Sequence, residues 1–290
     1  MSFEEKLKTS KFLVTSEVGP PKGTDMSKLL EEALLVKGRV DAINVTDLQS
    51  AVMRVGSLAT CKLLLEKGLE PILQLTCRDR NRLSLQSELL SAYVLGIRNV
   101  LCLTGDHTTL GDHPEAKPVF DLDSVQLLQV ATGLMEGKDM AGNPLQGTPH
   151  FCLGAVVNPG ADPLEPQLFK MELKIKAGAK FFQTQAVYDL KIFEKFMKEV
   201  EKWDVPVLGG IVLLKSAGMA KYMNENVAGV YVPDELIKRM AEAKKEDRPK
   251  VSVEIAAELI KGFKDLCRGV HIMPIGWDWL VPQVLDAAGL

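Results

Sequence analysis

The chain has 290 residues, 46% of them hydrophobic, and a formal net charge of −3. This composition is typical of a packed globular protein, and so small a charge gives no general attraction to nucleic acid or to an anionic membrane. The first residues, MSFEEKLKTSKF, contain no apolar core of signal-peptide length, and no apolar run approaches the roughly 20 residues of a membrane helix. We therefore expect a soluble, cytoplasmic protein without a nucleic-acid or membrane partner.

Eight short β-rich runs, each followed by a helical stretch, fill the chain from end to end. In chain order they cover residues 12–18, 42–47, 71–77, 99–106, 151–158, 180–188, 205–213 and 269–277. Eight strand–helix repeats in a chain of this length are what a (β/α)8 barrel requires. The sequence therefore predicts an α/β fold, a TIM barrel, that forms one catalytic domain over residues 1–290.

Between these runs, apolar residues recur at helical spacing. The predicted helices cover residues 26–38, 52–68, 82–96, 122–137, 166–179 and 190–203. Asp123 is expected to be the N-cap of the fourth helix. Three more helical stretches follow the seventh run, at 216–226, 234–245 and 252–267, and we interpret them as an insertion in the helical layer. The last helix, 278–289, is expected to be interrupted or kinked at Pro282.

A doubly wound sheet is the competing architecture, and it normally carries a GxGxxG turn after its first strand. Here that turn reads EVGPPKG, whose two prolines remove backbone donors, so the barrel is the better interpretation. In a barrel, the carboxyl ends of the strands carry the active site. Two turn-rich loops, 107–121 and 137–150, are expected to fold over a ligand there.

Glu17 is the most informative polar residue at a strand end. It interrupts an apolar run directly before Gly-Pro-Pro, which places it at the carboxyl end of the first strand. A carboxyl group that barrel walls partly desolvate can act as a proton donor near neutrality. A solvated glutamate at the end of the strand is the alternative.

Other strand ends also carry polar residues. Asp106 follows NVLCLTG, where a carboxylate can accept two parallel hydrogen bonds from an amidine-like edge such as that of a pterin; an Asx-turn is the alternative. In the sixth run, Gln183 and Gln185 point to the same side, and two glutamines on an inner face indicate a polar ligand surface. Thr46 and Thr76 lie at the ends of the second and third runs.

A basic cluster follows the third run, in CRDRNR. Its arginines, Arg78, Arg80 and Arg82, either hold a phosphate or carboxylate or form a solvated charge run. The five cysteines form no CxxC pair, which gives no support for a zinc or iron–sulfur site, and those in the strands are interpreted as core residues. His271 lies in an apolar run and is interpreted as a core histidine.

Together the strand ends resemble the methylenetetrahydrofolate reductase family over essentially the whole chain. The stretches that carry the resemblance are SEVGPPKG, NVTD, LQLTCRDRNR, LGIRNVLCLTGD, KAGAKFFQTQAVYD and GVHIMPIGW. Each is weak alone, but their order and spacing across successive strands make the match strong. The chain looks like the short bacterial and archaeal form, without the regulatory domain of the eukaryotic enzymes.

The resemblance implies a flavin-containing barrel, with FAD or FMN, that reduces 5,10-methylenetetrahydrofolate to 5-methyltetrahydrofolate in one-carbon metabolism. It implies catalytic roles for Glu17, Asp106 and Gln185. Glu17 is implied to assist protonation and opening of the imidazolidine ring, Asp106 to hold the pterin near the flavin, and Gln185 to contact the folate. We expect Gln183, on the same face, to line the folate surface too.

Flavin contacts are implied for Thr46, Thr76 and Lys174, as well as Asp106. Because no side chain donates hydride, a redox reaction requires such a cofactor. Two features depart from the family's pattern: the strand end reads LTGD without the arginine of some members, and GIVLLKSAGMA has small residues where some members place a stacking aromatic.

The departures leave the electron donor open, either NAD(P)H or an electron-donating partner protein. In the second case the chain is the catalytic subunit of an oligomer or larger redox complex. Two further alternatives are a related barrel that acts on another pterin carrier or uses a deazaflavin, and a flavin-free barrel that binds folate.

Overall fold

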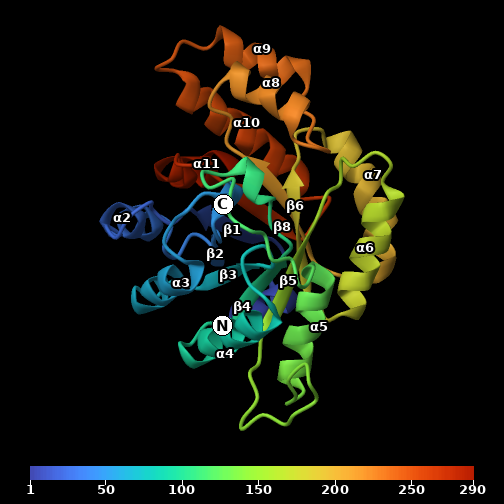
Figure 1. Ribbon diagram of the computed structural model, residues 1–290. Helices are drawn as coiled ribbons and strands as arrows, with labels where there is room; N and C mark the ends of the chain where they lie inside the picture. Colours follow the sequence, from blue (N-terminus) through green and yellow to red (C-terminus); the bar gives the residue numbers. More distant parts are fainter.

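The computed structural model describes residues 1–290 as a closed barrel of parallel strands surrounded by helices (Figure 1). The strands are β1 (Leu13–Val18), β2 (Ala42–Val45), β3 (Pro71–Thr76), β4 (Asn99–Leu103), β5 (Cys152–Val157), β6 (Phe181–Ala186), β7 (Val207–Val212) and β8 (Gly269–Met273). Each strand pairs with its neighbours in sequence, and β8 closes the barrel by pairing with β1. The predicted TIM barrel is confirmed, and every strand lies within its predicted run.

The helices form a layer around the barrel (Figure 1). They are α1 (Phe3–Thr9), α2 (Ser27–Leu35), α3 (Ser57–Glu66), α4 (Arg82–Val94), α5 (Ser124–Met135), α6 (Glu165–Lys176), α7 (Leu190–Val200), α8 (Ala217–Asn226), α9 (Asp234–Glu242), α10 (Arg248–Phe263) and α11 (Val281–Ala288). Short 3-10 helices are η1 (Gln49–Ala51), η2 (Thr108–Leu110), η3 (Glu201–Trp203) and η4 (Asp278–Leu280). None of the helices is long and apolar enough to cross a lipid bilayer.

The region after β7 contains the expected insertion. The helix α10 packs against β7, β8 and α11, whereas α8 and α9 lie beyond it at the top of Figure 1. The predicted N-cap is also confirmed, because the Asp123 carboxylate accepts the backbone N–H groups of Val125 and Gln126, both at 2.9 Å.

Three predictions are wrong: the start of the second predicted helix, the effect of Pro282 and the position of the loop 137–150. Residues 52–56 are not helical; η1 precedes them and α3 begins only after Gly56. Pro282 does not interrupt the last helix, because it lies in the first turn of α11, where its missing N–H would have no helical partner. The loop 137–150 joins α5 to β5 and therefore lies at the amino ends of the strands, where His150 contacts Glu4 of α1 at 3.0 Å. It cannot cover a ligand at the carboxyl ends.

The helix α1 closes the amino end of the barrel, and the sequence analysis did not predict it. A capping box joins Ser2 and Glu5 at its start. Phe3 is fully buried, and its ring meets that of Phe181 edge-to-face with centroids 5.2 Å apart. The Phe181 ring also occupies the space that a side chain at Gly154 would need, since a Cβ there would lie 2.2 Å from it. This apolar cluster is the floor of the barrel.

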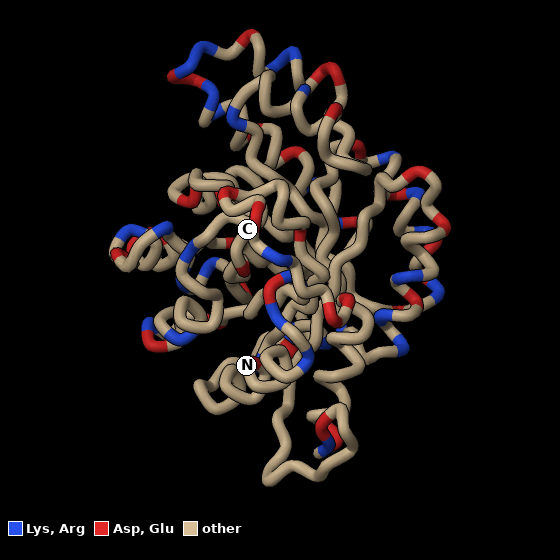
Figure 2. Tube along the Cα trace, in the orientation of Figure 1, with Lys and Arg blue, Asp and Glu red and all other residues tan.

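The outer surface of the helices carries interspersed positive and negative charges (Figure 2). Several form ion pairs four residues apart, such as Lys176 with Glu172 and Lys198 with Glu194. Exposed pairs of this kind contribute only about 0.3–0.5 kcal/mol each. The stability of the fold therefore depends on the buried apolar layer between helices and strands, and on the floor.

The cysteines of the strand runs are core residues, as predicted: Cys77, Cys102 and Cys152 are all buried. Cys61 of α3 is buried too. Burial raises the pKa of the Cys77 and Cys152 thiols to about 12, so neither forms a reactive thiolate near neutral pH.

Replacing Phe3 tests the contribution of α1 to the barrel. We expect Phe3→Ala to lower the free energy of unfolding by about 3–5 kcal/mol, because the change removes a buried ring and leaves a cavity in the floor. Urea unfolding followed by circular dichroism measures this loss. Phe169→Ala is the matched control, since Phe169 is 64% exposed. Equal stability of the two variants would show that the floor does not depend on α1.

Candidate active site

The barrel interior becomes polar above its apolar floor. The side chains of Thr15, Asn44, Gln183 and His271 project inward from β1, β2, β6 and β8, and all four are buried. Asn44 Nδ2 donates to Gln183 Oε1 at 2.5 Å, Gln183 Nε2 donates to Thr15 Oγ1 at 3.2 Å, and Thr15 Oγ1 lies 3.0 Å from His271 Nδ1. These buried polar groups satisfy one another, which explains why the barrel tolerates them.

Glu17 lies directly above this polar layer. Gln74 Nε2 donates to its Oε2 at 2.9 Å, and Gln49 Nε2 lies 3.5 Å from its Oε1. His271 Nε2 lies 3.6 Å from the same carboxylate. Since only 10% of the Glu17 side chain is exposed, the interpretation as a solvated strand-end glutamate is wrong.

His271 has a second role that the sequence analysis missed. It is buried and hydrogen-bonded, as expected of a core histidine. However, its Nδ1 faces the Thr15 hydroxyl and the Gln183 amide, and this leaves Nε2 directed at Glu17. No local sequence signal pairs His271 with Glu17, because they are far apart in the chain. Only the pairing of β8 with β1 in the closed barrel brings them together.

A cavity of about 430 Å³ opens at the carboxyl ends of the strands, and we call it the ligand cavity. Of the predicted site residues, it is lined by Glu17, Thr76, Asp106, Lys174, Gln183 and Gln185. Thr46 does not line it; that residue is buried, and its hydroxyl has no hydrogen-bond partner. Six of the seven predicted site residues, five from strand ends and Lys174 from α6, therefore line one cavity. Their roles as catalytic or binding residues stay predictions.

Asp106 lies three residues beyond the end of β4, after Gly105, whose φ of +94° suits a residue without a side chain. Its side chain is exposed, and its main-chain carbonyl accepts a hydrogen bond from Arg78 Nη1 at 3.2 Å. The carboxylate accepts no backbone N–H of the kind that defines an Asx-turn. It is therefore free to bind a ligand at the rim of the ligand cavity.

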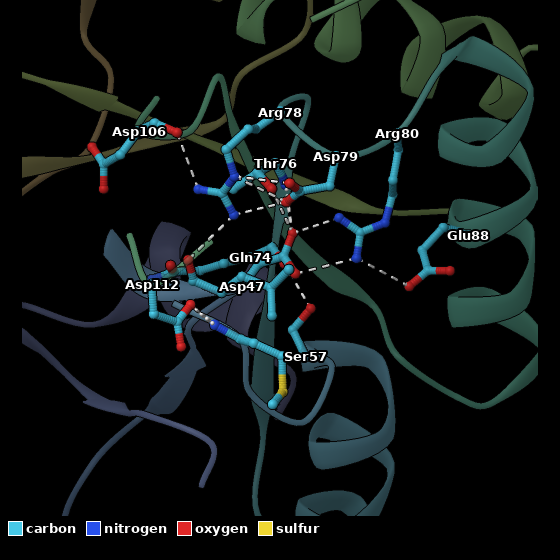
Figure 3. A network of polar contacts seen from close by, with 12 residues as sticks. Asp47, Ser57, Gln74, Thr76, Arg78, Asp79, Arg80, Glu88, Asp106 and Asp112 are labelled. Atoms are coloured by element: carbon cyan, nitrogen blue, oxygen red, sulfur yellow. Dashed lines mark hydrogen bonds and ion pairs between the residues drawn. The ribbon is translucent and has the colours of Figure 1, made fainter. Parts of the chain in front are cut away.

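The arginines after β3 do not form an open anion site (Figure 3). Arg78 pairs with Asp79 at 2.7 Å and is almost fully buried. Arg80 Nη1 donates to Asp47 at 2.8 Å, and that carboxylate also accepts the backbone N–H and the hydroxyl of Thr76.

Arg82 completes the set by pairing with Asp121 at 2.9 Å. Each arginine therefore has its own acid. The interpretation as a solvated run is wrong for Arg78 and Arg80, because both side chains are largely buried. Since Arg78 lines the ligand cavity, a contact of this residue with an anion stays a prediction. The pairs fix the loop that follows β3.

Lys174 supplies a buried positive charge to the ligand cavity. It projects from α6 and is 5% exposed, and its Nζ donates to the carbonyl oxygen of Val156 at 2.6 Å. Burial, together with the charge of Lys170, lowers its pKa from 10.5 to about 8. No carboxylate pairs with this amine directly. An anionic group in the cavity would compensate the buried charge.

The loop 107–121 lies over the same end of the barrel, as expected. Its 3-10 helix η2 packs against η1, and Val119 N donates to the carbonyl oxygen of Arg78 at 2.7 Å. Asp112 forms an ion pair with Lys22 and accepts the Met53 backbone N–H at 3.0 Å. The loop thereby joins the segments that follow β1, β2 and β3 into one rim.

Comparisons with a family model and with curated proteins point to the same family. The sequence model of the methylenetetrahydrofolate reductase family matches residues 2–289. Methylenetetrahydrofolate reductase 2 of Schizosaccharomyces pombe is 27% identical over 317 aligned positions, covering 99% of this chain and 47% of that protein. The probable methylenetetrahydrofolate reductase (NADPH) of Caenorhabditis elegans is 21% identical, covering 77% of this chain and 33% of that protein. The chain spans about half the length, or less, of these curated relatives.

Solved structures share the fold at lower identity. An uncharacterized protein from Clostridium thermocellum, which binds two copies of 5-methyl-5,6,7,8-tetrahydrofolic acid, gives a TM-score of 0.60 at 17% identity, covering 98% of this chain and 95% of that one. Oxaloacetate acetylhydrolase gives 0.55 at 11% identity, covering 97% of this chain and 81% of that one. Likeness at these identities shows a common barrel fold alone.

The buried amine of Lys174 makes stability depend on pH. Its pKa in the folded protein lies below that of an exposed lysine, so stability is lost as the pH falls from about 10.5 through about 8. We expect Lys174→Met to raise the free energy of unfolding at pH 7 by about 2 kcal/mol, after subtracting the lost hydrogen bond to Val156. At pH 10.5 this gain should vanish.

Urea unfolding at the two pH values measures the difference. Lys176→Met is the matched control, because Lys176 lies on the same helix with a 69% exposed side chain. A gain of the same size at both pH values would contradict the assignment of a costly buried charge to Lys174.

Proposed function

The chain belongs to the methylenetetrahydrofolate reductase family, and we propose that it reduces 5,10-methylenetetrahydrofolate to 5-methyltetrahydrofolate with a bound flavin, FAD or FMN. The observation that carries the proposal is the buried carboxyl group of Glu17 at the base of a polar cavity of about 430 Å³. The names of the related proteins and the folate bound by the Clostridium thermocellum protein support the substrate class.

The ligand cavity contains groups that fit a flavin. Lys174 offers a buried amine without a carboxylate partner, which suits the phosphate of either flavin nucleotide. Thr76 is held in place by Asp47, and Gly105 lets the backbone approach a planar ring closely. These residues would hold the cofactor, together with Asp106 at the rim. When bound, the flavin supplies the hydride that no side chain can donate.

Glu17 would provide the proton that opens the imidazolidine ring. A leaving amine must be protonated as its bond to carbon breaks, and a buried carboxylic acid is a suitable donor. Gln74 holds one carboxyl oxygen at 2.9 Å, and Gln49 lies near the other. The acid is therefore fixed in orientation before the substrate arrives.

Asp106, Gln183 and Gln185 would bind the folate. The free carboxylate of Asp106 can accept two N–H groups of a pterin edge, and a charge-assisted pair of this kind is stronger than a neutral hydrogen bond. Gln185 lines the ligand cavity beside it, whereas Gln183 is held by Asn44 and Thr15 and forms part of the cavity base.

A partner protein as electron donor is the second candidate, and one observation favours it. No phenylalanine, tyrosine or tryptophan lines the ligand cavity. A nicotinamide ring would therefore find no large aromatic side chain to stack on, although NAD(P)H remains the simpler donor. Stopped-flow reduction of the isolated flavoprotein decides between them: rapid bleaching by NADH or NADPH alone would exclude the need for a partner.

Glu17→Gln tests the proposed reaction. We expect this variant to lose methylenetetrahydrofolate reduction by roughly 10²–10⁴-fold, the usual contribution of general acid catalysis, while it retains flavin. Turnover is measured by the formation of methyltetrahydrofolate, and flavin content by absorbance of the purified protein. Glu258→Gln is the matched control, since Glu258 pairs with Arg239 on the outer surface. Normal turnover of Glu17→Gln would exclude Glu17 as the proton donor.

A further inference from the structure

A second cavity lies on the other side of Glu17, and we call it the side cavity. It has a volume of about 320 Å³ and lies between α2, the segment after β1 and the segment that contains η4. Glu17 and Gln49 line both cavities. Glu17 therefore borders a second space in addition to the ligand cavity.

The side cavity has an acidic lining. Its charged residues are Glu17 from β1, Asp25, Lys28 and Glu32 from α2 and the turn before it, Arg54 from the segment after η1, and Asp278 from η4. Lys28 forms a long contact of 3.8 Å with Glu32, and Arg54 Nη1 donates to the carbonyl oxygen of Pro20. Neither cation pairs with Asp278.

Asp278 is the group in the side cavity that is best suited to carry a proton. Burial, followed by the negative charge of Glu32 and then that of Glu17, raises its pKa from 3.8 to about 6. A carboxyl group with such a pKa both gains and loses a proton readily near neutral pH. The negative charge of Glu17 is thus one cause of the raised pKa of Asp278.

We propose that the side cavity is the route by which Glu17 regains its proton from solvent, with Asp278 as the relay residue. This inference rests on the proposed function, because it requires Glu17 to lose one proton in each turnover. Asp278 does not touch the substrate in this scheme; it acts only through Glu17.

The proton balance is simple. Glu17 would transfer one proton to the leaving nitrogen of the folate as the carbon–nitrogen bond breaks, and the carbon would accept a hydride, which a bound reduced flavin would supply. The Glu17 carboxylate then takes a proton from Asp278 through water in the side cavity, and Asp278 takes one from bulk solvent. One proton from solvent is consumed, and both acids return to their starting states.

The energetic cost of Asp278 supports a functional role. Because its pKa in the folded protein is raised, its contribution to stability is lost as the pH rises through about 6. At pH 7–8 the charge of this half-buried group destabilises the fold, and Asp278→Asn should be at least as thermally stable as the natural protein. The variant is thus expected to fold, and its melting temperature verifies this.

The test compares Asp278→Asn with Asp286→Asn in steady-state folate reduction from pH 5.5 to 8.5. Asp286 is the matched control, because it is an exposed carboxylate on the following helix that pairs with Arg39. We expect Asp278→Asn to lower kcat at pH 8 by about tenfold or more, with unchanged KM for folate and unchanged flavin content. We also expect formate or acetate to restore the rate of Asp278→Ala, because a small carboxylic acid can replace the relay.

Other results overturn the proposal. A raised KM with an unchanged pH profile would show that the side cavity binds part of the folate. A lower kcat without rescue by small acids would show a purely structural role.

The natural protein separates a failure of this proposal from a failure of the proposed function. If the proposed function is wrong, the natural protein does not reduce folate at all. In that event the coupling remains measurable by infrared titration of the Asp278 carboxyl group. We expect its midpoint to fall in Glu17→Gln, since the negative charge of Glu17 contributes to the raised pKa of Asp278. An unchanged midpoint would overturn the coupling.

Discussion

Closure of the barrel is the constraint on which the rest of the structure depends. It brings the inward side chains of β1 and β8 together, so that Thr15 and His271 meet although they lie at opposite ends of the chain. Polar side chains enclosed in this way are stabilised by hydrogen bonds to one another, because burial removes most of their contact with solvent. The layer formed by Asn44, Gln183, Thr15 and His271 meets that requirement, and it supports Glu17 from below.

Burial of the apolar floor stabilises the barrel and so offsets the cost of enclosing polar side chains. Below the polar layer, Phe3 and Phe181 fill the amino end of the barrel, and α1 excludes water from it. Above the layer, the buried amine of Lys174 and the half-buried acid of Asp278 each destabilise the protein near neutral pH. Groups that reduce stability and line a cavity are characteristic of functional sites, where pKa values are adjusted by burial and by neighbouring charges.

The sequence predicted the strands and most of the cavity because both follow from local patterns. Strand periodicity and the following turn place Glu17 and Gln185 at carboxyl ends, and the barrel then brings them together. Long-range pairing has no such local signal. The partner of Arg80 is Asp47, which lies two residues after β2, and His271 reaches Glu17 only when the barrel closes. The helix α1 escaped prediction because it is short, and its buried face is apparent only once the barrel floor exists.

The charges around the ligand cavity come from different elements. Lys170 and Lys174 enter from α6 and Glu17 enters from β1, whereas Asp47, Arg78 and Asp106 lie in the segments that follow β2, β3 and β4. In the proposed function, an anionic cofactor would lie beside α6, and the nitrogen that needs a proton would lie beside β1. The side cavity continues the acidic side toward solvent through Asp278. In the proposed scheme, proton supply and anion binding would therefore use different walls of one barrel mouth.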